Sequence, residues 1–188
     1  MNGSITLTSP KGTKIYIPDG LFINGQWQAP KLGKDQRIPV YNPATGKEIC
    51  HVNVGTKEDV DAAVEAAQKA FNTTWGLNST PARRGELMYK WADLIEKHQQ
   101  ELAELEALDN GKPRWMAETI DIADSIACLR YYAGLADKVH GKTIEINNAE
   151  KFAYTRIEPI GVCGAVIPWN YPIQVTTEPT EIATSSVG

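Results

Sequence analysis

Asn170 is the side chain whose setting in this sequence most favours chemistry. It lies between Pro168 and Pro172 in the stretch Pro-Trp-Asn-Tyr-Pro. Each proline fixes its own φ and biases the residue before it away from the helical region, so the turn is rigid. A carboxamide held in this way can donate a hydrogen bond to a developing oxyanion. The alternative is that Asn170 only satisfies its own backbone in a tight turn, as Asn commonly does.

The apolar run before this turn indicates how the turn is positioned. Residues 162–167, Val-Cys-Gly-Ala-Val-Ile, are apolar on both sides of any pleat, which is typical of a strand covered on both faces in a parallel sheet. Pro168 lacks an amide proton and would end that strand. Ligands of open α/β sheets bind outside the carboxyl ends of the strands. We therefore expect Asn170 at the mouth of a ligand crevice.

The cysteines do not suggest a reactive or metal-binding group. Cys50, Cys128 and Cys163 are widely separated and form no Cys-x-x-Cys motif, which argues against a disulfide framework and a zinc site. Each is interpreted as a small buried hydrophobe. Burial of Cys163 inside the expected strand would raise its thiol pKa and suppress the nucleophilic thiolate.

Composition limits the class of protein. The 188 residues are 42% hydrophobic and 22% charged, which is typical of a globular domain. The formal net charge is -4 and no Lys/Arg block occurs, which argues against binding to nucleic acid or to an anionic membrane. The amino terminus has neither the apolar centre of a signal peptide nor the Arg-rich pattern of a transit peptide. These features predict a cytoplasmic protein.

Two hairpins are predicted in the first third of the chain. Asn24-Gly25, between Leu-Phe-Ile and Gln-Trp, favours a type I′ turn and two short strands. Residues 37–41 and 47–54 form a second pair around Asn-Pro-Ala-Thr-Gly, whose residue types favour a turn.

Helices and a last hairpin follow. Thr56 with Asp59 resembles a capping box, and Thr80 followed by Pro81 is typical of an N-cap and a first helical residue. Apolar residues recur at helical spacing within residues 60–71, 87–95, 102–108 and 115–132. Residues 142–146 and 152–157 then predict an amphipathic hairpin.

Two acidic residues near the end of the third helix are candidate catalytic carboxylates. Glu106 and Asp109 lie just before Asn110-Gly111. Because the sequence places no partner carboxylate beside them, we favour a role for Asp109 and Asn110 in satisfying the helix terminus and the turn.

Several motifs occur in an order that resembles the aldehyde dehydrogenase superfamily. The resemblance extends from about residue 21 to residue 177. The matching stretches are Phe-Ile-Asn-Gly-Gln-Trp (22–27), Asn-Pro-Ala-Thr-Gly (42–46), Leu-Asp-Asn-Gly-Lys-Pro (108–113), Tyr-Tyr-Ala-Gly (131–134) and Pro-Trp-Asn-Tyr-Pro (168–172). Members of the superfamily are NAD(P)-dependent oxidoreductases that convert aldehydes into carboxylic acids through a cysteine thioester.

The resemblance implies roles for the residues of the turn. Ile167, Pro168, Trp169 and Asn170 would line the NAD or NADP cleft. Asn170 would also be catalytic, since its amide would donate to the oxyanion of the thiohemiacetal.

The resemblance also implies an α/β fold with an incomplete Rossmann-like NAD-binding domain. The expected parts are the amino-terminal β meander and helices (1–141), a β-hairpin arm for oligomerisation (142–158), the first strand and turn of the Rossmann-like sheet (159–177) and a divergent polar tail (178–188).

The chain departs from the family pattern after the turn. Glu178 and Pro179 stand where the family has a Trp-Lys pair, and the 188 residues end before the motifs of the general-base Glu and the nucleophilic Cys. We therefore expect a truncated aldehyde dehydrogenase that binds its cofactor incompletely and is inactive alone, whereas the full-length parent oxidises an aldehyde and forms a homo-oligomer. The alternative is an interaction protein that pairs with full-length subunits through residues 142–157.

Overall fold

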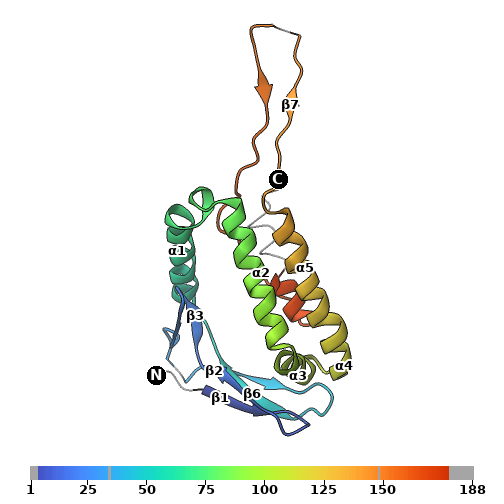
Figure 1. Cartoon of the computed structure of the whole chain (residues 1–188). Helices are drawn as coiled ribbons and strands as arrows, with labels where there is room; N and C mark the ends of the chain where they lie inside the picture. The colour runs from blue at the N-terminus through green and yellow to red at the C-terminus, as the bar shows by residue number, and fades with distance from the viewer. Residues whose placement is uncertain (1–3, 34, 148, 178–188) are drawn as a thin grey trace.

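The computed structural model describes residues 4–33, 35–147 and 149–177. Within these residues the chain combines helices with four two-stranded antiparallel sheets. The first six strands are β1 (Ser4–Thr8), β2 (Lys14–Pro18), β3 (Leu21–Ile23), β4 (Gln26–Gln28), β5 (Arg37–Tyr41) and β6 (Glu48–Asn53). They form the three hairpins at the amino-terminal end of the molecule (Figure 1).

The two hairpins predicted from turn residues are confirmed. Asn24 and Gly25 both have positive φ, 54° and 73°, as a type I′ turn requires. In the β3–β4 pair, the rings of Phe22 and Trp27 lie 5.1 Å apart on opposite strands. Strands β5 and β6 pair around the second predicted turn, within which the Gly46 amide donates to the Asn42 carbonyl at 2.7 Å.

The β1–β2 hairpin was not predicted, although its signal is present in the sequence. Ser-Ile-Thr-Leu-Thr and Lys-Ile-Tyr-Ile alternate polar and apolar residues around Ser-Pro-Lys-Gly. Leu7 and Ile15 are register partners and both are buried, so one face of this hairpin belongs to the core.

The predicted helices form, and their ends follow the expected chemistry. Their bounds are α1 (Lys57–Thr73), the 3-10 turn η1 (Gly76–Asn78), α2 (Pro81–Lys97), α3 (Gln99–Asn110), α4 (Arg114–Met116), the π-helical η2 (Ala117–Ile122) and α5 (Ala123–Leu135). At the start of α1, the Asp59 amide donates to the Thr56 hydroxyl and the Thr56 amide donates to the Asp59 carboxylate. This reciprocal pair is the predicted capping box. Thr80 caps α2 at the Arg83 amide, with Pro81 as the first helical residue.

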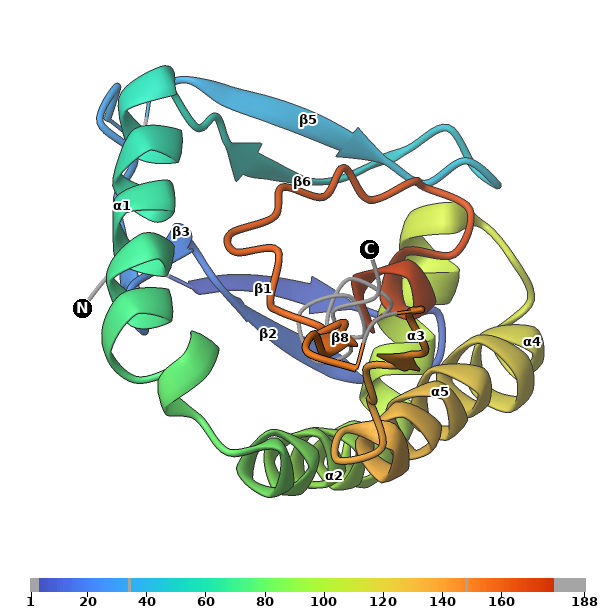
Figure 2. The same ribbon diagram turned by 90° about the horizontal axis from the view of Figure 1, so that it is seen from above.

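Helices α2, α3, η2 and α5, together called the helical layer, form the main core. Helices α2 and α5 lie side by side (Figure 1), and Gly85 allows their close approach, since a Cβ there would lie 2.7 Å from the carbonyl oxygen of Ala133. From above, α1 and α3 lie toward opposite ends of β1 and β2 (Figure 2). The buried residues of this core are Met88, Ala92, Ile95, Ala103, Ala117, Ile122, Ile126, Leu129 and Ala133.

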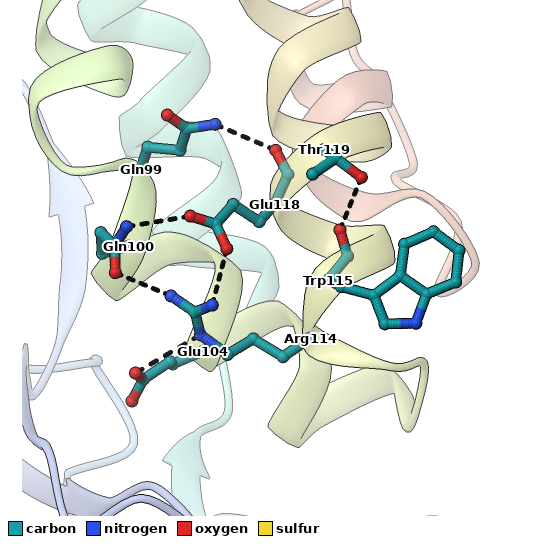
Figure 3. Close-up of polar contacts among 7 residues, drawn as sticks. All are labelled: Gln99, Gln100, Glu104, Arg114, Trp115, Glu118 and Thr119. Carbon is teal, nitrogen blue, oxygen red and sulfur yellow. Dashed lines mark hydrogen bonds and ion pairs between the residues drawn. The ribbon is translucent and has the colours of Figure 1, made fainter.

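A polar cluster centred on Arg114 joins α3 to α4 and η2 (Figure 3). The Arg114 guanidinium donates to Glu118 at 2.6 Å and to Gln100 at 2.8 Å, and its Nε lies 3.5 Å from Glu104. Gln100 donates in turn to Glu118 at 2.9 Å. The cluster thus fixes the angle between α3 and the helix that follows it.

The predicted last hairpin also forms. Strands β7 (Thr143–Ile144) and β8 (Ala153–Tyr154) pair antiparallel and project beyond the ends of α2 and α5 (Figure 1). The Thr155 amide extends the ladder by donating to the Lys142 carbonyl at 2.8 Å.

The buried strand predicted over residues 162–167 does not form, and this prediction is corrected. These residues have no strand assignment, Val166 is 98% exposed and Cys163 is exposed. A strand needs a neighbouring backbone to bond with, and among the described residues no strand pairs with this segment. The described residues therefore contain no Rossmann-like sheet, and the predicted polar tail 178–188 lies outside them. None of the described helices has the length and apolar content that a membrane crossing requires.

Candidate functional site

The four predicted site residues are consecutive and exposed, and the last two of them form a turn. Residues 169 and 170 form the turn, and residues 172–177 are helical, with the Val175 amide donating to the Tyr171 carbonyl at 3.0 Å. Trp169 is 80% exposed. The Asn170 carboxamide is exposed as well, and no hydrogen bond holds it within the described part of the chain. The structure therefore contradicts the alternative in which this amide hydrogen-bonds with its own backbone.

Lys112 anchors the backbone of this turn. Its ammonium donates to the Asn170 carbonyl at 2.8 Å and lies 3.8 Å from the centroid of the Tyr171 ring. Lys112 follows Gly111, whose positive φ of 80° ends α3 and turns the chain toward the site. Its third partner is the carboxylate of Asp121, a residue with no exposed surface.

A buried pair of carboxyl groups lies behind Lys112. Glu106 on α3 faces Asp121 on η2 and the backbone amide of Ile173. Desolvation raises the pKa of Glu106 to about 7, with the Asp121 hydrogen bond and charge acting in the same direction and the Lys112 charge opposing them. One oxygen of each carboxyl, Glu106 Oε1 and Asp121 Oδ1, has no donor among the described residues. A proton retained on Glu106 can satisfy this arrangement by donating to Asp121.

Asp121 was not predicted from the sequence, which left Glu106 without a partner carboxylate. A signal for Asp121 exists in the helical spacing. Ala117, Asp121, Ser125 and Leu129 recur every four residues and all four have no exposed surface. An acidic residue on an otherwise small and apolar stripe indicates a buried carboxylate that needs a partner.

The apolar hollow nearest to these carboxyls measures about 330 Å³. Glu106 and Asp109 supply its acidic lining, and Pro172 and Ile173 reach it from the far side of the turn. Residues 167–170 do not line it, so the structure brings Glu106 and Ile173 together but leaves the Asn170 amide outside this hollow.

Comparison with known proteins decides the family. The model of the aldehyde dehydrogenase family matches residues 28–185. The chain belongs to the aldehyde dehydrogenase family. This confirms the resemblance inferred from the five motifs.

Among the cysteines of this aldehyde dehydrogenase chain, Cys50 and Cys128 are partly buried. Cys163 is exposed, so the expectation that it is buried is wrong.

Curated relatives and solved structures agree with the family match. An aldehyde dehydrogenase of Aspergillus niger is 49% identical over 168 residues, covering 89% of this chain and 33% of the relative. The mitochondrial aldehyde dehydrogenase of Rattus norvegicus is 50% identical over 155 residues, covering 81% of this chain and 29% of the relative. The NAD+ complex of aldehyde dehydrogenase from Bacillus cereus superposes with a TM-score of 0.83 at 43% identity, covering 89% of this chain and 33% of that one. The chain thus spans about a third of the length of the relatives that it matches.

Proposed function

We propose that this chain is the amino-terminal part of an NAD(P)-dependent aldehyde dehydrogenase and that Asn170 is its oxyanion donor. The observation that carries the proposal is the Asn170 carboxamide, which is free to bind a ligand while Lys112 and two prolines hold its backbone. The family match and the NAD+ complex of the Bacillus cereus relative support the substrate and cofactor classes.

The chain's own residues have a limited set of tasks in this mechanism. An NAD(P) cofactor, when bound, would supply the hydride acceptor for this oxidation. Ile167, Pro168 and Trp169 present exposed backbone and apolar surface directly before the amide, which fits one wall of a cleft for a flat ring. The Asn170 side chain donates Nδ2–H to the oxygen that gains charge, a contribution of roughly 2.7 to 4 kcal/mol for one such donor.

The phosphate-binding part of the cofactor site is not supplied by these residues. The 188 residues contain no Gly-x-Gly-x-x-Gly or Walker motif. We infer that residues 162–167 become the first strand of a Rossmann-like sheet when a longer family member supplies the neighbouring strands, and that the isolated chain binds the cofactor incompletely. A cytoplasmic location stays a prediction, and the rat relative is mitochondrial.

A chimera tests the proposed function. Residues 28–177 replace the matching segment of the Aspergillus niger relative, and NADH formation is followed with acetaldehyde as the substrate. The chimera should turn over, and Asn170→Ala should lower kcat by about 10²- to 10³-fold. Asn72→Ala is the matched control, since Asn72 is exposed on α1, its side-chain oxygen accepts from Gln68 on the same helix, and its bond with Asn78 uses the backbone carbonyl. A folded chimera with full activity after Asn170→Ala would contradict the assigned role.

The same assay tests the 188-residue chain alone. We expect no turnover above the blank, because the family's nucleophilic Cys and general-base Glu motifs are not among these residues. Turnover by the purified chain would overturn this part of the proposal.

Hairpin β7–β8 favours a second function, in which the chain pairs with full-length subunits through residues 142–157. Phe152 and Tyr154 are 73% and 66% exposed, and their rings lie 5.7 Å apart on the projecting arm. Two large apolar side chains exposed together are typical of an interaction surface. A tagged chain should co-purify with a full-length relative, and Phe152→Ser with Tyr154→Ser should abolish the association. Trp115→Ser is the control, since Trp115 is 60% exposed on α4. Failure of the unaltered chain to co-purify would leave only the first function.

A further inference from the structure

Lys112 joins two parts of the chain that are far apart in sequence. Its side chain leaves the end of α3 and donates to the carbonyl of Asn170, 58 residues later, at 2.8 Å. The same ammonium contacts the face of the Tyr171 ring. The contact therefore acts on the backbone at the residue whose side chain we assign to the oxyanion.

Asp121 fixes the place of Lys112. A carboxylate without exposed surface is strongly destabilised when its cation is removed, so Lys112 cannot leave the site without a large cost. An ammonium has three donors, and two of them are satisfied here by Asp121 and by the Asn170 carbonyl. Lysine is thus able to neutralise Asp121 and hold the turn at the same time.

Glu106 closes the arrangement from the other side. It lies beside Asp121 and the backbone amide of Ile173, at the start of the helix that follows the turn. The contacts run in sequence from the Ile173 amide through Glu106, Asp121 and Lys112 to the Asn170 carbonyl. Residues 170–173 are thereby held at both ends by a single cluster in the helical layer.

We propose that Lys112, supported by Asp121 and Glu106, is a positioning residue that directs the side-chain amide of Asn170. The amide itself is exposed and bonds to no described residue, so only its backbone can fix where it points. Pro168 and Pro172 restrict φ on either side of the turn, and the Lys112 contact restricts the peptide plane between Asn170 and Tyr171. This inference rests on the proposed function of Asn170.

Hydrogen exchange of the 188-residue chain, read by mass spectrometry, tests the positioning directly. Lys112→Met should speed exchange of the backbone amides within residues 170–175 by about tenfold, the loss expected for one hydrogen bond to a charged group. Lys112→Arg keeps donors for both oxygens and should restore most of the protection. Lys90→Met is the matched control, because Lys90 pairs with Glu86 at 2.7 Å on the exposed face of α2.

A double variant separates positioning from simple neutralisation of Asp121. Lys112→Met combined with Asp121→Asn removes both charges of the Lys112–Asp121 ion pair, so Asp121 is not left as an unpaired carboxylate and the helical layer should exchange near the original rate. Residues 170–175 should still exchange faster, because the Asn170 carbonyl has lost its donor. If residues 170–175 exchange at the rate of the unaltered chain in both the single and the double variant, the proposal is overturned. If Lys112→Met does not fold, the double variant alone decides.

Kinetics of the chimera distinguish a failure of this inference from a failure of the proposed function. Lys112→Met should lower kcat about tenfold while the aldehyde KM changes little, and Lys112→Arg should recover most of kcat. A faster-exchanging turn together with a chimera that keeps full activity after Asn170→Ala would reject the function of Asn170 but not its positioning. An Asn170-dependent chimera that is indifferent to Lys112→Met would reject the positioning alone.

Discussion

The helical layer and residues 162–167 are both rich in apolar side chains, yet those of the helical layer are buried and those of residues 162–167 are largely exposed. Leu129 on α5 has no exposed surface, whereas Val166 is 98% exposed. The difference lies in the backbone. A helix satisfies its own amides and carbonyls and needs only one apolar stripe covered, while a strand depends on a neighbour for every hydrogen bond. Apolar character therefore stabilises a segment only where the fold supplies its partners.

Truncation of a core residue should have the largest effect. Leu129→Ala removes a fully buried α5 side chain from the core, and we expect the free energy of unfolding to fall by about 2 to 5 kcal/mol. Urea unfolding followed by circular dichroism measures the change. Leu94→Ala is the control, since Leu94 is 55% exposed on α2 and its loss should change little. Equal midpoints for the two variants would show that the helical layer is not the core.

Glu106 gives the helical layer a dependence on pH. Its folded pKa of about 7 lies above the ordinary 4.5, so between these values the unfolded chain releases a proton that the folded chain retains. This group therefore lowers the free energy of unfolding as pH rises from 4.5 to about 7.

Glu106→Gln should flatten that slope when urea unfolding is repeated across the window. Glu86→Gln should not, because Lys90 and Arg83 lower the pKa of Glu86 to about 2 and its contribution is lost only as pH falls below 4.5. If Glu106→Gln leaves the pH dependence of the free energy of unfolding unchanged, Asp121 and Lys112 do not face an ionisable partner.

The Arg114 cluster (Figure 3) extends the comparison to charged side chains. Arg114→Met leaves Glu104 and Glu118 without their cation, and Glu104 is buried, so the free energy of unfolding should fall by about 1 to 3 kcal/mol. Arg130→Met removes ion pairs to the exposed Asp93 and Glu96 and should have little effect. Thermal unfolding of both variants checks the contrast, and a larger loss in Arg130→Met would reverse it.

Features that were predictable from the sequence depend on residues close together in the chain. The Thr56–Asp59 box, the Thr80 cap and the Asn24-Gly25 turn each involve residues within four positions, so local chemistry suffices. Lys112 contacts Asn170, which lies 58 residues later in the chain, and the residues next to Lys112 do not predict that contact. The partner of Glu106 was likewise missed because it lies on another helix. The turn around Asn170 was predicted correctly, whereas the strand before it depends on distant pairing that these residues do not supply.

A smaller effect is expected where a helix end is satisfied locally. Thr56→Ala removes the hydroxyl that accepts from the Asp59 amide, and we expect a loss of about 1 kcal/mol in the free energy of unfolding. Thr73→Ala is the control on the same helix, since its exposed hydroxyl donates to the Lys69 carbonyl, which lies inside α1 and not at a helix N-terminus. Urea unfolding should separate the two variants, and identical midpoints would argue against the capping box.

Val166→Ser should have the smallest effect, and it tests the comparison most sharply because the same substitution can be made in two contexts. In the 188-residue chain the side chain is already exposed, so the free energy of unfolding should change by less than about 0.5 kcal/mol. In the chimera, where we propose that residues 162–167 gain neighbouring strands, the same change should cost about 1.5 to 3 kcal/mol through lost apolar burial. A loss of equal size in both proteins would mean that the segment is packed without added strands, and the partner-dependence drawn from Val166 and Leu129 would fail.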